Sequence, residues 1–75
     1  MKYDERLKTL REERNIKQQV IADILQTSQS YYAQYENGKR QIPFDRAIIL
    51  AEFYNVSLDY IAGFTNEKRP LYRKK

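Results

Sequence analysis

The sequence lacks three residue types that carry much of protein chemistry. Its 75 residues contain no cysteine, no histidine and no tryptophan. Disulfide frameworks, thiol or imidazole catalysis and the usual zinc ligand sets are therefore excluded together. We expect a protein that is stabilised by packing alone, that binds no cofactor or metal ion, and that is not an enzyme.

Long apolar runs are absent as well. No run approaches the roughly 18 residues that a membrane span requires, and the N-terminal MKYDERLK has no apolar signal core. A soluble, cytoplasmic protein without a membrane partner is the expectation. A chain of 75 residues makes one small domain, which buries only about 60% of its unfolded surface and has no room for a deep catalytic cleft.

Positive charge is concentrated at one end of the chain. The net charge is +4, yet residues 1–66 hold nine basic and nine acidic residues, whereas EKRPLYRKK at 67–75 holds five basic residues and one glutamate. Such a tail can be an arm for an anionic partner or only a solubilising end. We divide the chain into a folded domain at residues 1–65 and a basic C-terminal tail at residues 66–75.

Apolar residues recur at helical spacing in five segments, and no strand pattern is of comparable strength. The expected helices run from about 4 to 14, 18 to 25, 28 to 37, 44 to 54 and 57 to 63. The second and third are separated by only three or four residues, and helices joined by such a turn commonly cross at about 90–120°.

Residues that start or stop helices occur at the ends of these segments. Asp4, Ser28 and Ser57 are expected N-caps, because their side-chain oxygens can accept backbone N–H bonds. Pro43 suits the entry to the fourth helix. The helix stops are Asn15, Asn37-Gly38 and Asn55, residues that tolerate the left-handed conformation.

The third helix has two contrasting faces. Tyr32 and Tyr35 fall on the side of the neighbouring apolar helix and are expected in the core. Gln29, Ser30 and Gln34 form an uncharged polar stripe on the opposite side. A glutamine amide carries both a donor and an acceptor and can bind the N6 and N7 edge of adenine in a major groove. Glutamine is also a good helix former on a wet surface, and the residues alone leave both interpretations open.

The segment RLKTLREERNIKQQVIADILQTSQSYYAQYENGKRQIP and, more loosely, LAEFYNVSLDYIAG resemble the Cro and phage-repressor type helix-turn-helix, also called the XRE family. The most specific features are Gln18, Ala22 four residues later, Ser28, and the ending YENGKRQIP. The resemblance implies an all-α, five-helix lambda-repressor-like domain, in which the second and third helices form the helix-turn-helix.

The resemblance also implies roles for individual residues. It assigns base reading to Gln29, Ser30 and Gln34, with Ser28 and Tyr31 beside them; phosphate contact to Gln18, Lys17, Asn37, Lys39 and Arg40; and a structural ion pair to Arg11 and Glu36. Tyr31 can stack against a sugar or a thymine methyl group, or only shield the turn.

Three positions depart from the family pattern. Asn15 replaces a common glycine but tolerates the same conformation. Lys17 stands where Thr, Ser or Asn normally caps the second helix, and its ammonium cannot accept amide hydrogen bonds but can reach a phosphate. Gln26 stands where the turn usually has glycine, so either it adopts a positive φ at some cost or the turn differs.

The leading hypothesis is a sequence-specific regulator of transcription, a repressor, that reads the major groove of double-stranded DNA with residues 28–37 of each subunit of a homodimer. Candidate dimer contacts are Ile49, Phe53, Tyr60 and Phe64, and Leu71 and Tyr72 of the tail can pair across the dimer or contact phosphate. No small-molecule ligand is expected. The alternative is an antitoxin-type protein-interaction module that uses the same domain for autoregulation; an enzyme is disfavoured further because carboxylates are not clustered.

Overall fold

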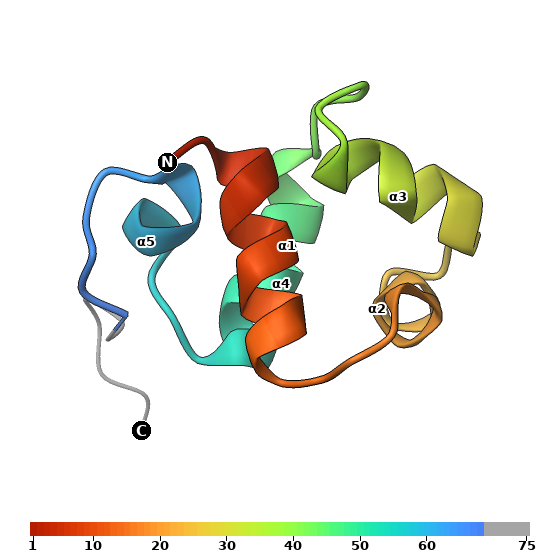
Figure 1. The fold of residues 1–75 in the computed structure, drawn as a ribbon, viewed down its shortest axis with the longest axis horizontal. Coiled ribbons are helices and arrows are strands. Elements are labelled where there is room, and N and C mark those ends of the chain that lie inside the picture. Colours follow the sequence, from red (N-terminus) through yellow and green to blue (C-terminus); the bar gives the residue numbers. More distant parts are fainter. Residues whose placement is uncertain (69–75) are drawn as a thin grey trace.

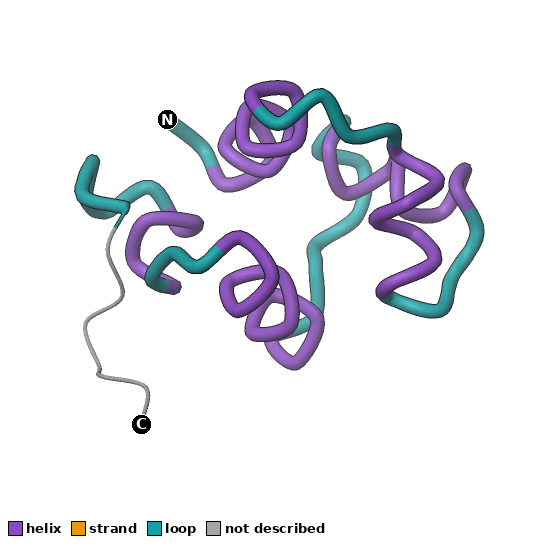
Figure 2. The backbone as a smooth tube through the Cα atoms, turned by 90° about the horizontal axis from the view of Figure 1, so that it is seen from below, coloured by secondary structure: helices purple, strands orange, loops and turns teal. Residues whose placement is uncertain are grey.

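The computed structural model describes residues 1–68, which fold into five helices without a strand (Figures 1 and 2). The helices are α1 (Tyr3–Glu13), α2 (Gln18–Ile24), α3 (Gln29–Glu36), α4 (Phe44–Tyr54) and α5 (Leu58–Ala62). The predicted all-α, five-helix fold is therefore confirmed. The predicted tail contacts Leu71 and Tyr72 lie outside the described residues.

Two serines start helices as predicted. The Ser28 hydroxyl accepts the Tyr31 N–H at 3.1 Å, and the Ser57 hydroxyl accepts the Tyr60 N–H at 2.9 Å. These bonds satisfy backbone donors that the first turn of a helix leaves without a partner.

The predicted cap at Asp4 is wrong. Helix α1 begins at Tyr3, so Lys2 holds the N-cap position and Asp4 lies within the first turn. The carboxylate of Glu5 reaches back and accepts the Lys2 N–H at 3.2 Å. Asp4 and Glu5 instead place negative charge at the start of α1, where the helix dipole favours it.

Left-handed residues end or redirect the chain between helices. Asn15, Gln26 and Asn55 have φ values of 56°, 57° and 57°, and Gly38 has a φ of 73°. Gln26 thus takes the strained conformation that glycine would adopt more cheaply, which decides between the two alternatives for the turn. Only Gly38 of the predicted Asn37-Gly38 stop is left-handed, because Asn37 has a φ of −90°.

One apolar core holds the helices together. Helix α1 lies centrally and contacts α3 and α5, while α2 packs on α3 and α4 packs on α5 (Figure 1). Fully buried members of this core include Leu7, Ile21, Tyr32, Leu50 and Tyr54. The α2–α3 unit therefore lies at one end of the domain and is attached to α1 through α3 (Figure 1).

A buried arginine fastens the C-terminal end of the described chain, and no sequence pattern pointed to it. Arg6 is 5% exposed, its guanidinium carbon lies 4.0 Å from the centre of the Tyr60 ring, and its Nη2 donates to Asn66 Oδ1 at 3.4 Å. The Ser57 N–H also donates to the Lys68 carbonyl at 3.1 Å. Residues 66–68, assigned to the tail from sequence, are thus attached to the folded body.

Candidate nucleic-acid interface

Helix α3 presents the uncharged stripe predicted from the sequence. Gln29 and Ser30 are exposed and Gln34 is half-buried, whereas Tyr32, Tyr35 and Glu36 are buried. The aromatic and apolar side of the helix anchors it on α1 and α2. Its polar side is left facing outward.

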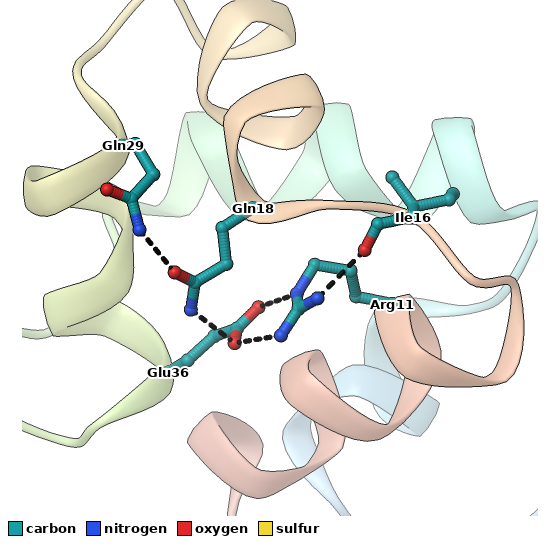
Figure 3. A network of polar contacts seen from close by, with 5 residues as sticks. All are labelled: Arg11, Ile16, Gln18, Gln29 and Glu36. Carbon is teal, nitrogen blue, oxygen red and sulfur yellow. Dashed lines mark hydrogen bonds and ion pairs between the residues drawn. The ribbon is translucent and has the colours of Figure 1, made fainter.

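A buried ion pair ties α3 to α1. Arg11 Nε donates to Glu36 Oε2 at 2.8 Å and Arg11 Nη2 donates to Glu36 Oε1 at 3.0 Å, a two-point contact (Figure 3). The side chains of Arg11 and Glu36 are only 13% and 1% exposed. Arg11 Nη1 also donates to the Ile16 carbonyl at 2.8 Å, which ties the α1–α2 loop to the same guanidinium.

The ionised state of this pair is favoured despite its burial. Burial by itself raises the pKa of Glu36, but hydrogen bonds from Arg11 and Gln18 and the nearby Tyr32 hydroxyl outweigh it, so the net pKa lies below the ordinary value. The hydrogen bond to Glu36 raises the pKa of Arg11 against an opposing effect of burial. Glu36 is therefore a carboxylate and can only accept hydrogen bonds.

This carboxylate sets the direction of a chain of hydrogen bonds that ends at the protein surface. Gln18 Nε2 donates to Glu36 Oε1 at 3.0 Å, and Gln29 Nε2 donates to Gln18 Oε1 at 2.6 Å (Figure 3). Because Glu36 cannot donate, Gln18 must present its amide nitrogen to it and its oxygen to Gln29. Gln29 must then use its own nitrogen, which leaves its Oε1 and one N–H without a partner in this chain of bonds.

The other end of the α3 stripe is held by a second cation. Arg40 Nε donates to Gln34 Oε1 at 3.2 Å, and the Arg40 guanidinium carbon lies 4.6 Å from the centre of the Tyr31 ring. Tyr31 in turn packs edge-on against Tyr35 with ring centres 5.8 Å apart. Arg46, which sequence reasoning passed over, donates from Nη1 to the Tyr35 hydroxyl at 2.9 Å.

The remaining predicted contact residues lie at the surface around α3. Lys17, Asn37, Lys39 and Arg40 are exposed. Lys17 holds the N-cap position of α2 without a side-chain cap bond, as its chemistry requires. The Ser28 hydroxyl serves as the α3 cap and lies 3.4 Å from the Ser30 hydroxyl.

The predicted dimer contacts differ in exposure. Ile49 and Phe53 are each 39% exposed and Phe64 is 84% exposed, so all three are available to a partner. Tyr60 must be removed from that set, because it is 5% exposed and its ring is covered by Arg6. Phe44 was missed: it is 70% exposed, and with Phe64 it borders a hollow of about 540 Å³. Its helical spacing gave no signal that it would stay outside the core.

The described residues offer neither a metal site nor a membrane span. No group of three or more acidic side chains within residues 1–68 is arranged to hold a metal ion. None of the helices in that part of the chain combines the length and the apolar character needed to cross a membrane.

Residues 7–61 match the family described as Helix-turn-helix. The chain belongs to this family. The match spans more than half of the chain and contains α2, α3 and the turn between them. The resemblance to XRE-type proteins drawn from the sequence is thereby confirmed.

Relatives of this helix-turn-helix chain occur in Bacillus subtilis (strain 168). The uncharacterized HTH-type transcriptional regulator YobD is 34% identical over 73 residues, which cover 97% of this chain and 65% of YobD. The uncharacterized HTH-type transcriptional regulator YqaE is 36% identical over 88% of this chain and 58% of its own length, and the HTH-type transcriptional regulator AnsR is 32% identical over 87% and 56%. The chain thus spans less than two thirds of the length of these relatives. No solved structure shows a significant match.

Proposed function

We propose that this helix-turn-helix domain binds double-stranded DNA in a sequence-specific manner and regulates transcription, acting as a repressor. Helix α3 enters the major groove and its polar side faces the base edges. The observation that carries the proposal is the chain of hydrogen bonds from Arg11 through Glu36 and Gln18 to Gln29. The buried ion pair fixes Gln18, and Gln18 in turn fixes the surface amide of Gln29 in one orientation. A fixed amide favours recognition of a base, whereas a glutamine that is only solvated would be free to rotate.

The free atoms of Gln29 complement adenine. Its Oε1 can accept from the adenine N6 amino group while its remaining N–H donates to N7, the two-point contact that distinguishes adenine in the major groove. Because Gln18 already fixes the amide, less side-chain freedom is lost on binding. Ser30, one residue along the helix, can contact a neighbouring base through its hydroxyl.

Exposed polar and basic residues supply the contacts to the DNA backbone. Lys17 before α2, together with Asn37, Lys39 and Arg40 after α3, can bind phosphates on the two sides of the groove. Gln18 keeps one N–H for a phosphate, because its oxygen and its other N–H are used within the protein. These contacts position the domain and carry no sequence information of their own.

A homodimer completes the proposal. One such domain reads only a few base pairs, and two domains related by a twofold axis can read half-sites about one helical turn apart. Exposed Ile49, Phe53 and Phe64 are the proposed contacts between subunits. Sedimentation of the wild type and of Phe64→Ser as a function of concentration tests this part: the variant should dissociate at a higher concentration, and a wild type that stays monomeric excludes the dimer.

Selection of bound sequences from random double-stranded DNA tests the function as a whole. Gln29→Ala should lose about 1–3 kcal/mol on the selected site and little on random DNA. Gln19→Ala is the matched control, because Gln19 is another exposed glutamine, bonded to Asp23 within α2. An equal loss for Gln29→Ala on both kinds of DNA, or no enriched sequence at all, contradicts sequence-specific reading.

The basic tail is proposed to contact phosphate. Truncation after Lys68 removes four basic residues, at 69, 73, 74 and 75. The slope of log affinity against log salt concentration should become shallower by about 0.9 for each phosphate that the shortened chain no longer neutralises. An unchanged slope assigns the tail another role.

A further inference from the structure

The two glutamines of the α3 stripe use opposite ends of their side-chain amides for hydrogen bonds within the protein. Gln29 is used within the protein as a hydrogen-bond donor, through its Nε2 to Gln18. Gln34 is used as an acceptor, through its Oε1 from Arg40. An arginine has five N–H donors and no acceptor, so Arg40 can only face the oxygen of the Gln34 amide. What remains free therefore differs between the two: Oε1 and one N–H on Gln29, and the whole NH₂ group on Gln34.

Arg40 is fixed to Gln34 by more than one bond. The carbonyl oxygen of Gln34 accepts the Lys39 N–H at 3.0 Å and the Arg40 N–H at 3.2 Å, so the backbone folds back over the end of α3. The guanidinium then lies on the face of Tyr31, 4.6 Å from the ring centre. Because Tyr31 rests edge-on against buried Tyr35, this face is anchored to the core. Tyr31 thus contacts Arg40, a partner that the sequence did not indicate.

We propose that Arg40 is a positioning residue that presets Gln34 to read a keto base, guanine or thymine, in place of the adenine that an unconstrained glutamine can bind. The inference rests on the proposed function. Guanine offers O6 and N7 as acceptors and thymine offers O4, and both suit the NH₂ group that Gln34 leaves free. An adenine amino group has to share Oε1 with a charged guanidinium, which is the stronger donor.

Base preference at the position read by Gln34 shows whether Arg40 positions Gln34 or only binds phosphate. Bound sequences are selected from random DNA with the whole chain, for the wild type and for Gln34→Ala, Arg40→Met and Arg40→Lys. The Gln34→Ala variant identifies the base pair by lowering its preference about 5- to 150-fold. At that pair the wild type should prefer guanine or thymine.

The two Arg40 variants differ in what they retain. Arg40→Met has no donor, so the Gln34 amide is free to turn over and adenine should be admitted at this pair. Arg40→Lys keeps a donor for Oε1 and should keep the keto preference. If Arg40 only grips phosphate, Arg40→Met lowers affinity for all sequences alike and leaves the base preference unchanged, which overturns the inference.

Gln29→Ala in the same selection separates two kinds of failure. The assignment of Gln34 is overturned if the wild type prefers adenine at the position it reads, or if Gln34→Ala changes the base preference at no position. The proposed function still stands in that case if Gln29→Ala changes a base preference. If neither glutamine variant changes any base preference, the proposed function fails together with the inference.

Discussion

Replacing Glu36 by glutamine tests whether the buried ion pair holds α3 in place. The substitution keeps the shape of the side chain, but it turns one acceptor oxygen into an NH₂ group. Arg11 contacts both carboxylate oxygens, so one of its N–H groups then faces a donor, and its charge loses its counter-ion. The side chain of Glu36 is 1% exposed, so water cannot replace the missing bond.

The expected loss is large for so small a domain. Removing one partner of a buried pair costs about 3–5 kcal/mol. Arg11 is 13% exposed and keeps its bond to the Ile16 carbonyl, which favours the lower end, about 3 kcal/mol. Seventy-five residues at about 0.05–0.15 kcal/mol each give an unfolding free energy of about 4–11 kcal/mol in total. Glu36→Gln should therefore lose a quarter or more of the stability.

The effect should also depend on pH. Folding lowers the pKa of Glu36 below its ordinary value of 4.5, so the stabilisation is fully present above about pH 4.5 and is lost as the pH falls through the folded-state pKa. Urea denaturation followed by circular dichroism at several pH values measures it. The difference between wild type and variant should be constant near neutrality and shrink in acid.

Glu13→Gln is the matched control for this measurement. Glu13 pairs with Lys68 at 3.1 Å, but the two side chains are 47% and 54% exposed. The same chemical change at that site should cost no more than about 1 kcal/mol. A Glu36→Gln variant as stable as the Glu13→Gln variant at pH 7, or a difference that persists undiminished in acid, refutes the reasoning.

Substitutions at three further positions address local features. Gln26→Gly should raise the urea midpoint, because relief of the left-handed conformation, about 1–2 kcal/mol, exceeds the about 0.5–1 kcal/mol entropic cost of glycine; a lower midpoint contradicts the strain. Ser28→Ala should destabilise the domain by about 1 kcal/mol, while Ser28→Asp keeps the cap and the stability. If both variants lose the same stability, the side chain at position 28 does not stabilise α3 as a cap. Burial raises the pKa of Tyr54 to about 12, so the stabilisation is complete below pH 10 and is lost as the pH rises through about 12. Tyr54→Phe should therefore unfold less readily in alkali than the wild type, and unchanged alkaline unfolding excludes this residue as the cause.

Local sequence signals were enough to predict most of the fold. Serine caps, Pro43 and the asparagine stops act within a few residues of themselves, and helical spacing identified Tyr32 and Tyr35 as core residues. The first cap was misplaced because Asp4 looks like a cap by residue type, whereas α1 begins at Tyr3 without a side-chain cap bond and Glu5 accepts the Lys2 N–H from inside the helix. The residue type alone therefore does not show where a helix begins when a side chain inside the helix bonds to the backbone before it.

The candidate site was only partly predictable, because its contacts join residues far apart in the chain. Gln18 and Gln29 carry no pattern that couples them, yet their amides meet at 2.6 Å. Tyr60 looked available at helical spacing, but Arg6, 54 positions earlier, lies over its ring. Base-reading roles for Gln29, Ser30 and Gln34 stay predictions, now joined to definite hydrogen-bonding partners.

The hydrogen bonds within the stripe also determine which of its positions can be exchanged separately. Replacing Gln29 leaves the Gln18 oxygen without its donor, and replacing Gln34 releases Arg40, so either change disturbs a second residue. Ser30 shares only a 3.4 Å contact with the Ser28 hydroxyl. Under the base reading proposed above, a library built at position 30 should therefore yield altered operators from single substitutions, while new side chains at 29 or 34 also change the surroundings of 18 or 40. Within the proposed reading stripe, position 30 is thus the one that can be varied independently of a bonded partner side chain, whereas positions 29 and 34 cannot.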